Sequence, residues 1–227
     1  MEAIVLAGGL GTRLQSVVSD VPKPMASIED KPFLEYILKY LKKNDISRVI
    51  LSVGYKWEII KEYFGDSFDG IELIYSVEDE PLGTGGAIKK AISKVTSNEV
   101  YIINGDTFFN VNLNKLELVN DSKLMLSLKN MQDFDRYGCV ESDENNLVTK
   151  FTEKSYRKVG NINGGIYLAS KDIFDDFDLA TVFSFEEFME NNLQKLNISS
   201  MVFDNYFIDI GIPQDYEKAQ KEIKNHI

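Results

Sequence analysis

Short apolar runs alternate with amphipathic stretches along the first half of the chain. The runs are a few residues long and rich in Ile and Val, which is typical of strands buried on both faces of a parallel sheet. The stretches between them gather their apolar residues on one helical face. This pattern predicts strands at 3–7, 48–53, 71–75 and 100–103, and helices at 30–43, 56–64 and 84–93. Such alternation indicates an α/β fold with a mainly parallel sheet flanked by helices.

The second half of the chain has more strands and shorter connections. Strands are predicted at 123–130, 138–142, 147–152, 163–168 and 199–203, and helices at 171–177, 185–196 and 213–224. Strands that follow one another closely favour an antiparallel or mixed extension of the sheet. Because no repeat, low-complexity segment or linker interrupts residues 1–227, we expect one continuous domain.

Composition narrows the classes of partner. The formal net charge is −11, which argues against nucleic acid and anionic membranes, because both attract clustered Lys and Arg. No apolar run approaches the ~20 residues of a membrane span, and no leader pattern opens the chain. The single cysteine, Cys139, excludes an internal disulfide framework and is expected to be a small buried apolar residue. We therefore expect a cytoplasmic protein.

A cluster of phenylalanines in the second half allows two interpretations. Their spacing is helical, which favours packing in the core, whereas an exposed cluster would form an interface between two copies. The residues are Phe174, Phe177, Phe183, Phe185 and Phe188. A homodimer is accordingly a weak expectation from the sequence.

The most informative stretch is the glycine-rich turn after the first predicted strand. Gly8, Gly9 and Gly11 remove side chains where backbone N–H groups can approach an anion, and the helical pattern that follows adds a positive dipole end. Arg13 and Lys23 supply two cations nearby. These features predict a site for nucleotide phosphates.

Two common phosphate-binding motifs do not fit this turn. A dinucleotide-binding turn needs glycine where Leu14 stands, and a P-loop needs a Gly-Lys-Ser/Thr sequence that is absent here. A purely structural glycine turn is the plain alternative. Pro22 and Pro24 favour the functional interpretation, because they stiffen the backbone on both sides of Lys23.

Two aspartates follow apolar runs and stand beside glycine. Asp106 ends the run at 100–103, and Asp209 lies in the sequence Phe-Ile-Asp-Ile-Gly. Ligands of open parallel sheets bind at the carboxyl ends of strands, and Mg²⁺ takes one or two protein carboxylates together with substrate phosphates. Either aspartate alone is as readily a turn residue, but the pair favours a Mg²⁺ site.

Several motifs together resemble the sugar-1-phosphate nucleotidylyltransferases. The first is Leu6–Leu14 with Pro22-Lys23-Pro24. The others follow in the family's order over essentially the whole chain: Pro81–Ala87, Asn104-Gly105-Asp106, Glu153-Lys154, Asn163-Gly164-Gly165 and Phe207–Gly211. The family usually has proline after its Glu-Lys pair, where this chain has Ser155, so the sugar-site loop is expected to differ in shape.

The resemblance implies a Rossmann-like nucleotidyltransferase fold, with a nucleotide-binding half at 1–112 and a sugar-binding half at 113–227. The C-terminal β-helix of larger relatives is not expected.

The implied reaction joins a nucleoside triphosphate and a sugar 1-phosphate, giving a nucleotide sugar and pyrophosphate. Arg13 and Lys23 would be catalytic, with Asp106 and Asp209 holding Mg²⁺. The implied nucleotide-binding residues are Leu6, Ala7, Gly8, Gly9, Gly11, Thr12, Glu78, Glu80, Gly83, Thr84, Asn104 and Gly105. The implied sugar-phosphate-binding residues are Gly138, Glu153, Lys154, Asn163 and Gly164.

The chemistry agrees with this resemblance. A phosphate oxygen is already ionised at neutral pH, so the attack needs neither a protein nucleophile nor a strong base. The enzyme has to align and neutralise two anions. The only histidine, His226, stands near the end of the chain, which argues against a histidine-dependent mechanism.

Among short family members, the chain is similar to guanylyltransferases that act on D-glycero-α-D-manno-heptose 1-phosphate. GTP is therefore the expected nucleotide, and capsule or lipopolysaccharide assembly the expected use of the product. Guanine presents N–H donors, so Glu78 or Glu80 is a candidate acceptor; solvated acidic residues are the alternative. Three other functions stay open at this point: a UTP- or CTP-dependent transferase, a phosphocholine cytidylyltransferase with a tyrosine cage (Tyr137, Tyr156, Tyr167), and a catalytically silent homologue.

Overall fold

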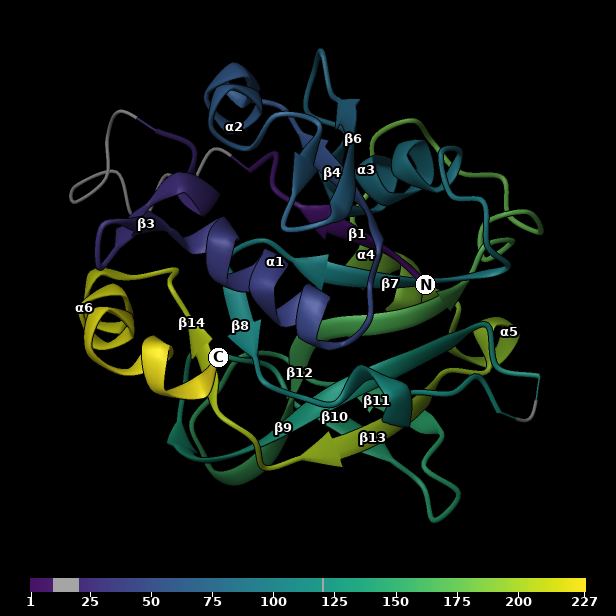
Figure 1. Ribbon diagram of the computed structural model, residues 1–227. Coiled ribbons are helices and arrows are strands. Elements are labelled where there is room, and N and C mark those ends of the chain that lie inside the picture. The colour runs from purple at the N-terminus through teal and green to yellow at the C-terminus, as the bar shows by residue number, and fades with distance from the viewer. Residues whose placement is uncertain (10–20, 120) are drawn as a thin grey trace.

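The computed structural model describes residues 1–9, 21–119 and 121–227. In this part of the chain, eight strands form a central sheet in the order β13-β9-β12-β7-β1-β4-β6-β5. Figure 1 shows the sheet crossing the molecule between helices. The strands are β1 (Glu2–Leu6), β4 (Arg48–Val53), β5 (Ser67–Phe68), β6 (Ile71–Val77), β7 (Glu99–Asn104), β9 (Leu124–Phe134), β12 (Arg157–Ser170) and β13 (Ser199–Phe203).

The sheet is mixed but mainly parallel, as predicted. β1 lies between β4 and β7 and is parallel to both, and β6 extends this parallel set on the far side of β4. β12 then runs antiparallel to both β7 and β9, whereas β13 is parallel to β9. The second half of the chain therefore continues the sheet of the first half.

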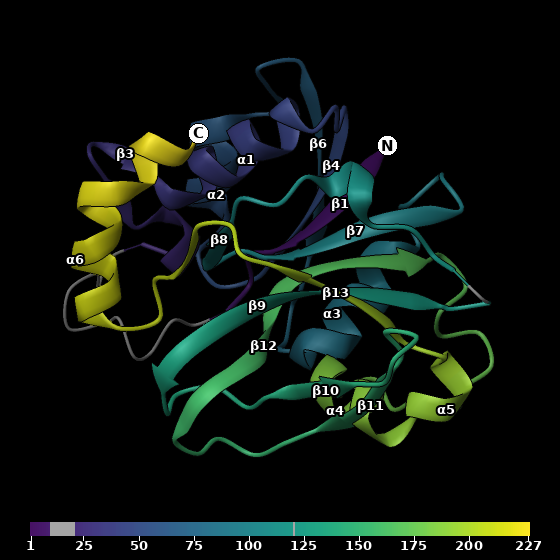
Figure 2. The same ribbon diagram turned by 90° about the horizontal axis from the view of Figure 1, so that it is seen from below.

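Helices cover both faces of the sheet because its strands are apolar on both sides. Ala3 and Val5 of β1 belong to one apolar cluster with α1, while Ile4 points into a second cluster with α3 and α4. Figure 2 shows α1 and α2 above the sheet and α3, α4 and α5 below it. The helices are α1 (Phe33–Lys43), α2 (Trp57–Phe64), α3 (Gly83–Ile92), α4 (Phe185–Asn191), α5 (Leu193–Leu196) and α6 (Pro213–Glu222). Short 3₁₀ helices are η2 (Lys23–Met25), η3 (Leu113–Lys115) and η4 (Ile223–His226). Among the described residues, none of the helices combines the length and apolar character needed to span a membrane.

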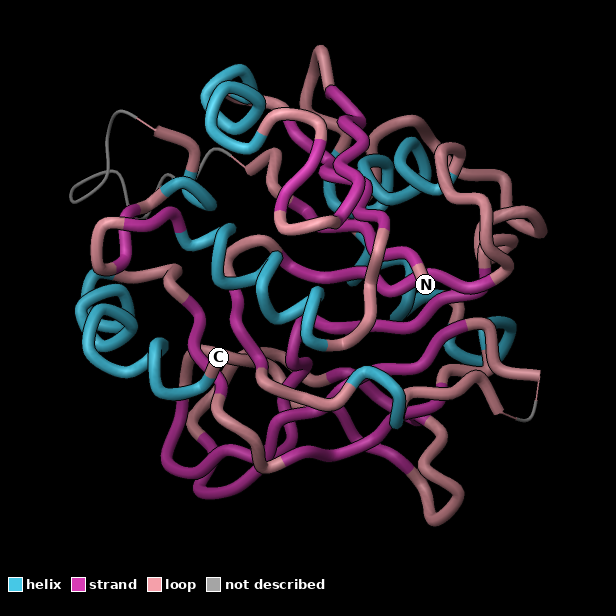
Figure 3. Tube along the Cα trace, viewed as in Figure 1, coloured by secondary structure: helices cyan, strands magenta, loops and turns pink. Residues whose placement is uncertain are grey.

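Short strand pairs add three small ribbons outside the central sheet, visible in Figure 3. They are β2 (Ser27–Ile28) with β3 (Lys31–Pro32), β8 (Thr107–Phe109) with β14 (Phe207–Asp209), and β10 (Val140–Ser142) with β11 (Val148–Phe151). The β8–β14 pair matters for function, because its register places Asp209 opposite Thr107. A late segment of the chain is thereby fixed beside Asp106.

Some predicted elements differ in the structure. Residues 171–177 form successive turns instead of a helix: Ile173 N–H donates to Ser170 O, and Asp175 N–H to Asp172 O. Aspartate favours turns because its side chain bonds nearby polar groups, and Asp172 pairs with Lys123 at 2.6 Å. The helix predicted at 30–43 begins at Phe33.

The phenylalanine cluster belongs to the core. Phe174, Phe185 and Phe188 are each less than 5% exposed and pack against one another with α3. The interface interpretation of this cluster is therefore wrong, and the core interpretation is confirmed. Cys139 is buried, as expected.

Candidate active site

A cavity of about 850 Å³ lies at the carboxyl ends of β1, β4 and β7. This is the edge at which open parallel sheets bind ligands. Its described lining is Leu6, Gly8, Gly9, Lys23, Pro24, Ser52, Gly54, Tyr55, Glu78, Asp79, Glu80, Pro81, Gly83, Thr84, Ala87, Asn104, Gly105, Asp106 and Glu186. Most of the predicted nucleotide-binding residues are thus brought together on one wall.

Four predicted residues, three for the nucleotide and one catalytic, are absent from the described lining. Gly11, Thr12 and Arg13 lie outside the described residues. Ala7 is described, but it is 1% exposed and packs into the core on the α1 side of the sheet. Its backbone N–H donates to Ser52 O at 2.7 Å, which continues the pairing of β1 with β4.

Two glycines permit close backbone approach at the floor of the cavity. A Cβ on Gly105 would lie 2.3 Å from Leu6 O, and one on Gly8 would lie 2.8 Å from Glu78 Oε1. A side chain at Gly105 would clash with backbone, whereas one at Gly8 would first displace the Glu78 carboxylate. The first glycine turn is therefore packed directly against the loop that carries Glu78.

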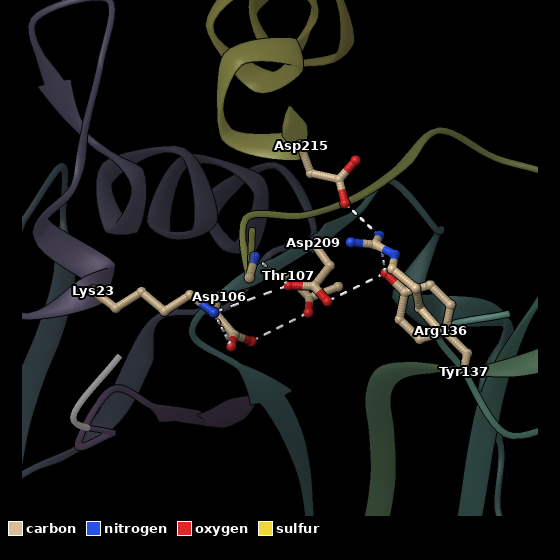
Figure 4. Close-up of polar contacts among 8 residues, drawn as sticks. Lys23, Asp106, Thr107, Arg136, Tyr137, Asp209 and Asp215 are labelled. Atoms are coloured by element: carbon tan, nitrogen blue, oxygen red, sulfur yellow. Dashed lines mark hydrogen bonds and ion pairs between the residues drawn. The ribbon is translucent and has the colours of Figure 1, made fainter. Parts of the chain in front are cut away.

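Lys23 is held rigidly and aimed at two carboxylates. Pro22 is extended and Pro24 lies inside η2, so proline fixes the backbone on both sides, as predicted. The Lys23 side chain is 11% exposed; its Nζ donates to Asp106 Oδ2 at 2.7 Å and lies 4.0 Å from Asp209 Oδ1. Figure 4 shows the lysine reaching between the two aspartates. One buried cation thus faces two acidic groups from distant segments.

Asp209 occupies an environment that opposes its charge. Burial raises its pKa, and the Asp106 carboxylate raises it further, while Lys23 acts in the opposite direction. Gly211 N–H donates to Asp209 Oδ1 at 2.7 Å, and Tyr137 OH donates to Oδ2 at 3.2 Å. Both oxygens are therefore oriented by fixed donors.

Tyr137 belongs to a polar chain that runs to the last helix. Arg136 donates to Tyr137 OH at 3.0 Å and forms an ion pair with Asp215 in the first turn of α6. Figure 4 shows these groups on the side of Asp209 opposite Lys23. Sequence reasoning gave no separate role to Arg136, although it stands in the Phe134–Gly138 stretch that is similar to the guanylyltransferases, and none to Asp215.

The donor set around Lys23 suits a divalent cation. Asp106 Oδ2 and Asp209 Oδ1 lie 2.7 and 4.0 Å from the same Lys23 Nζ, so two carboxylates supply hard oxygen ligands close to one point. No group of three or more His, Cys, Asp or Glu side chains gathers for metal binding among the described residues. The arrangement fits a cation that completes its coordination with substrate phosphates and water.

The two acidic candidates for base recognition differ in their surroundings. Glu78 is half-buried; its Oε1 accepts from Ser52 Oγ and its Oε2 from Leu82 N–H, each at 3.2 Å. Glu80 is exposed on the cavity wall and has no polar partner in the described part of the chain. Glu78 thus shapes the loop, whereas Glu80 is free to turn toward a ligand.

The second glycine turn is a packing surface for a distant segment. A Cβ on Gly83, whose φ is +70°, would lie 2.5 Å from Phe183 O, and one on Gly86 would lie 2.5 Å from Thr181 O. Gly85 N–H donates to Phe183 O at 3.0 Å. The glycines at the start of α3 therefore admit residues 181–183 and do not present all their N–H groups to an anion.

The predicted sugar-site residues are not among the described lining of the cavity. Gly138 packs against Thr152, where a Cβ would lie 2.2 Å from the carbonyl oxygen, while Glu153 and Lys154 are exposed. Asn163 Nδ2 donates to Tyr167 OH at 2.8 Å. Gly164 is buried against Phe109.

A link between the sugar segment and the nucleotide cavity runs through Gly165. A Cβ there would lie 2.8 Å from Asn104 Nδ2, and the pairing of β12 with β9 is irregular at this point. Asn104 itself lines the cavity. The Asn163-Gly164-Gly165 segment therefore adjoins the end of β7.

The three tyrosines considered for a quaternary-ammonium cage do not converge. Tyr167 is 1% exposed in the core, where it packs edge-on against Phe185. Tyr156 is 67% exposed and donates to Asp133, whereas Tyr137 donates to Asp209. The structure gives no support to a phosphocholine site made of these residues.

Comparison with known proteins agrees with this fold. Residues 2–226 match the family described as Nucleotidyl transferase, and the chain belongs to that family. The class of protein is therefore a nucleotidyltransferase.

The particular relatives are sugar-phosphate guanylyltransferases. The chain is 61% identical to the D-glycero-alpha-D-manno-heptose 1-phosphate guanylyltransferase of Campylobacter jejuni, covering 95% of this chain and 97% of the relative. It is 53% identical to the enzyme of the same name from Aneurinibacillus thermoaerophilus, with both chains covered completely. Among solved structures, HddC from Yersinia pseudotuberculosis complexed with GMP-PN is similar, with a TM-score of 0.85 and 39% identity over 97% of this chain and 98% of that one.

Proposed function

We propose that this enzyme transfers GMP from GTP to D-glycero-α-D-manno-heptose 1-phosphate, releasing pyrophosphate. The observation that carries the proposal is the buried Lys23 ammonium between Asp106 and Asp209, at the edge of a cavity of nucleotide size. The names and near-complete coverage of the two bacterial relatives support the choice of nucleotide and sugar.

The reaction requires an anionic sugar phosphate to attack the anionic α-phosphate of the nucleotide. Lys23 is proposed to bind the α-phosphate and the incoming phosphate, lowering the repulsion between them. Because Lys23 is 11% exposed, its charge acts with little screening by water. Alignment and charge neutralisation then supply most of the rate enhancement.

Asp106 and Asp209 are proposed to hold Mg²⁺. The ion, when bound, would polarise the α-phosphate and neutralise the pyrophosphate as it leaves. Tyr137 and Gly211 keep the Asp209 oxygens oriented.

The remaining roles follow the family resemblance. Gly8, Gly9, Gly11 and Thr12 are proposed to cradle the triphosphate, with Arg13 on the departing pyrophosphate and Lys154 on the sugar phosphate. Glu80 is proposed as an acceptor for guanine N–H groups, because it lies on the cavity wall without a polar partner in the described residues. Gly138, Glu153, Asn163 and Gly164 are proposed to surround the sugar.

A matrix of substrates tests the proposal. Purified enzyme is incubated with each of GTP, UTP, CTP and ATP against heptose 1-phosphate and mannose 1-phosphate, and pyrophosphate release is measured. The expected result is the highest kcat/KM with GTP and heptose 1-phosphate. Faster turnover with UTP and a hexosamine phosphate would overturn the guanylyl assignment, and no turnover with any pair would favour a silent nucleotide-sugar-binding homologue.

Replacement of Mg²⁺ tests the cofactor. Turnover is expected to stop with a chelator and to return with Mg²⁺.

We further propose that the product feeds capsule or lipopolysaccharide assembly and that the enzyme acts in the cytoplasm, where GTP is available. Light scattering on the purified chain tests the expected homodimer.

A further inference from the structure

The described wall of the cavity is divided by charge. Lys23 stands at one end with Asp106, whereas the other end carries four acidic residues, namely Glu78, Asp79, Glu80 and Glu186. Glu78 adjoins Gly8, where a Cβ would lie 2.8 Å from Glu78 Oε1. The carboxylates of Glu80 and Glu186 would repel a triphosphate that lay directly against them, because like charges repel strongly in a partly enclosed site. The acidic end is therefore suited to the nucleoside, which is the part of the nucleotide that carries N–H and O–H donors.

Glu186 reaches this wall from the second half of the chain. It lies in the first turn of α4, and the segment just before α4 is bonded to the start of α3. Phe183 N–H donates to Leu82 O at 3.1 Å, and Gly85 N–H donates to Phe183 O at 3.0 Å. These backbone bonds fix the position of Glu186 relative to Thr84.

The carboxylate of Glu186 is oriented by two hydroxyl groups. Thr84 Oγ1 and Ser184 Oγ donate to Glu186 Oε2 at 2.8 and 2.9 Å. Each hydroxyl in turn accepts from a backbone N–H, Thr84 from Phe185 at 2.8 Å and Ser184 from Glu187 at 3.2 Å. Both hydroxyl protons are thus directed at the same oxygen. The other oxygen, Oε1, has no hydrogen-bond partner in the described part of the chain.

We propose that Glu186 is a specificity-determining residue that accepts a hydrogen bond from the guanosine part of GTP through Oε1. This inference rests on the proposed function and deepens it. The donors available to Oε1 are the N1–H and 2-amino group of guanine and the ribose hydroxyls, and all of them belong to the nucleoside. Thr84 and Ser184 act as positioning residues that hold the acceptor in place.

The matched variants are Glu186→Gln and Glu187→Gln. Glu187 lies in the same turn of α4 and is exposed, but it does not line the cavity. With Glu186→Gln, we expect KM for GTP to rise about tenfold with kcat nearly unchanged, since a charge-assisted hydrogen bond is lost. Glu187→Gln is expected to stay within about twofold of wild type, since it removes no contact to the ligand.

Nucleotide analogues identify the donor. Wild type and Glu186→Gln are compared with GTP, ITP, which lacks the 2-amino group, and 2′-deoxy-GTP and 3′-deoxy-GTP, which each lack one ribose hydroxyl. The analogue that lacks the true donor should be discriminated against by wild type and not by the variant. Equal loss for GTP and all analogues would identify guanine N1–H, which every analogue retains, as the donor, whereas a wild-type KM for GTP in Glu186→Gln would overturn the proposal. If Glu186→Gln fails to fold, Glu186→Asp is compared with wild type in the same way. Its side chain is one methylene shorter, so its carboxylate lies further from the ligand.

Binding of guanosine by calorimetry separates this inference from the proposed function. Guanosine has no phosphate and needs no sugar substrate, so its affinity reports the nucleoside contact alone. Weaker guanosine binding by Glu186→Gln than by Glu187→Gln supports the contact even if heptose 1-phosphate proves to be the wrong acceptor. Equal guanosine binding by both variants would contradict it.

Discussion

The Tyr137 hydroxyl lies 3.2 Å from Asp209 Oδ2, on the side of that carboxylate that faces away from Lys23. Tyr137 also accepts a hydrogen bond from Arg136, whose guanidinium is paired with Asp215. A rigid polar chain thus leads from α6 to a carboxylate proposed to bind metal. Residues that hydrogen-bond to a metal ligand hold that ligand in its orientation. Replacing them commonly lowers metal affinity or activity, as replacing the ligand itself does.

Tyr137→Phe is expected to weaken metal binding while leaving the fold intact. The ring still packs against Phe207, but Asp209 loses one fixed donor. Mn²⁺ affinity measured by electron paramagnetic resonance should fall about tenfold, and the Mg²⁺ concentration for half-maximal turnover should rise by a similar factor. Tyr156→Phe, which removes an exposed hydroxyl bonded to Asp133, is the control. Unchanged Mn²⁺ affinity in Tyr137→Phe would exclude the positioning role.

Lys23→Gln is expected to lower kcat by about 10²-fold or more, because a preorganised cation at the reacting phosphates is lost. Lys218→Gln removes an exposed lysine of α6 and is expected to leave kcat unchanged. Steady-state pyrophosphate release checks both. A Lys23→Gln enzyme that retains most of its kcat would show that another cation binds the α-phosphate.

Asp106→Asn is expected to remove most Mg²⁺-dependent turnover without unfolding the protein. The side chain is 40% exposed, and an amide has nearly the same size as the carboxylate it replaces. Asp204→Asn, which alters an exposed partner of Lys129, is the matched control. Thermal melts establish that both variants are folded. Near-normal turnover of Asp106→Asn would contradict the metal assignment.

Glu2 makes the stability of the fold depend on pH. Burial would raise its pKa, but hydrogen bonds from Ser97, Thr96 and Arg48 outweigh burial and lower the pKa from 4.5 to about 2. Because the pKa is lower in the folded state, the stabilisation is present above pH 4.5 and is lost as the pH falls toward 2.

At neutral pH this difference corresponds to about 3 kcal/mol of unfolding free energy. Glu2→Gln is expected to lose about that amount at pH 7 and progressively less below pH 4.5. Urea unfolding at several pH values measures the difference. Glu144→Gln, an exposed substitution, should follow wild type at every pH. A stability difference that does not shrink in acid would show that Glu2 acts through packing and not through its charge.

Gly86→Ala tests the packing of residues 181–183 on α3. Its Cβ would lie 2.5 Å from Thr181 O, so the segment that carries Glu186 must move. We expect a loss of about 1–3 kcal/mol in unfolding free energy and a higher KM for GTP. Lys89→Ala, on the exposed face of α3, is expected to change neither. Normal KM in Gly86→Ala would show that the segment can shift without affecting the nucleotide.

The sequence predicts the parts of this site that depend on local pattern. The sequence identifies Lys23 because prolines stand on both sides of it, and Asp106 because it follows an apolar strand. Both features depend only on neighbouring residues. The meeting of Asp106 with Asp209 depends on the β8–β14 pair, and three-residue strands leave no periodic signal. The position of each aspartate after an apolar run suggested the pair, and the resemblance to a family supported it.

Glu186 and residues 171–177 show why other features were missed. An exposed acid in the first turn of a helix is common for electrostatic reasons alone, so Glu186 carries no signal of a ligand until its place on the cavity wall is known. Residues 171–177 have helical spacing of apolar side chains, but four aspartates between 172 and 178 favour turns. Local hydrogen bonding prevailed there over periodicity.

Because the chain is synthesised from its N-terminus, the β8–β14 pair also decides when the site is complete. Lys23 and Asp106 emerge early and the strands around them adjoin, but Asp209 must wait until synthesis has reached β14. The nascent first half therefore has half of the carboxylate pair and cannot complete the site proposed for the metal. The site proposed for the metal is completed only when β14 pairs with β8, over a long sequence separation.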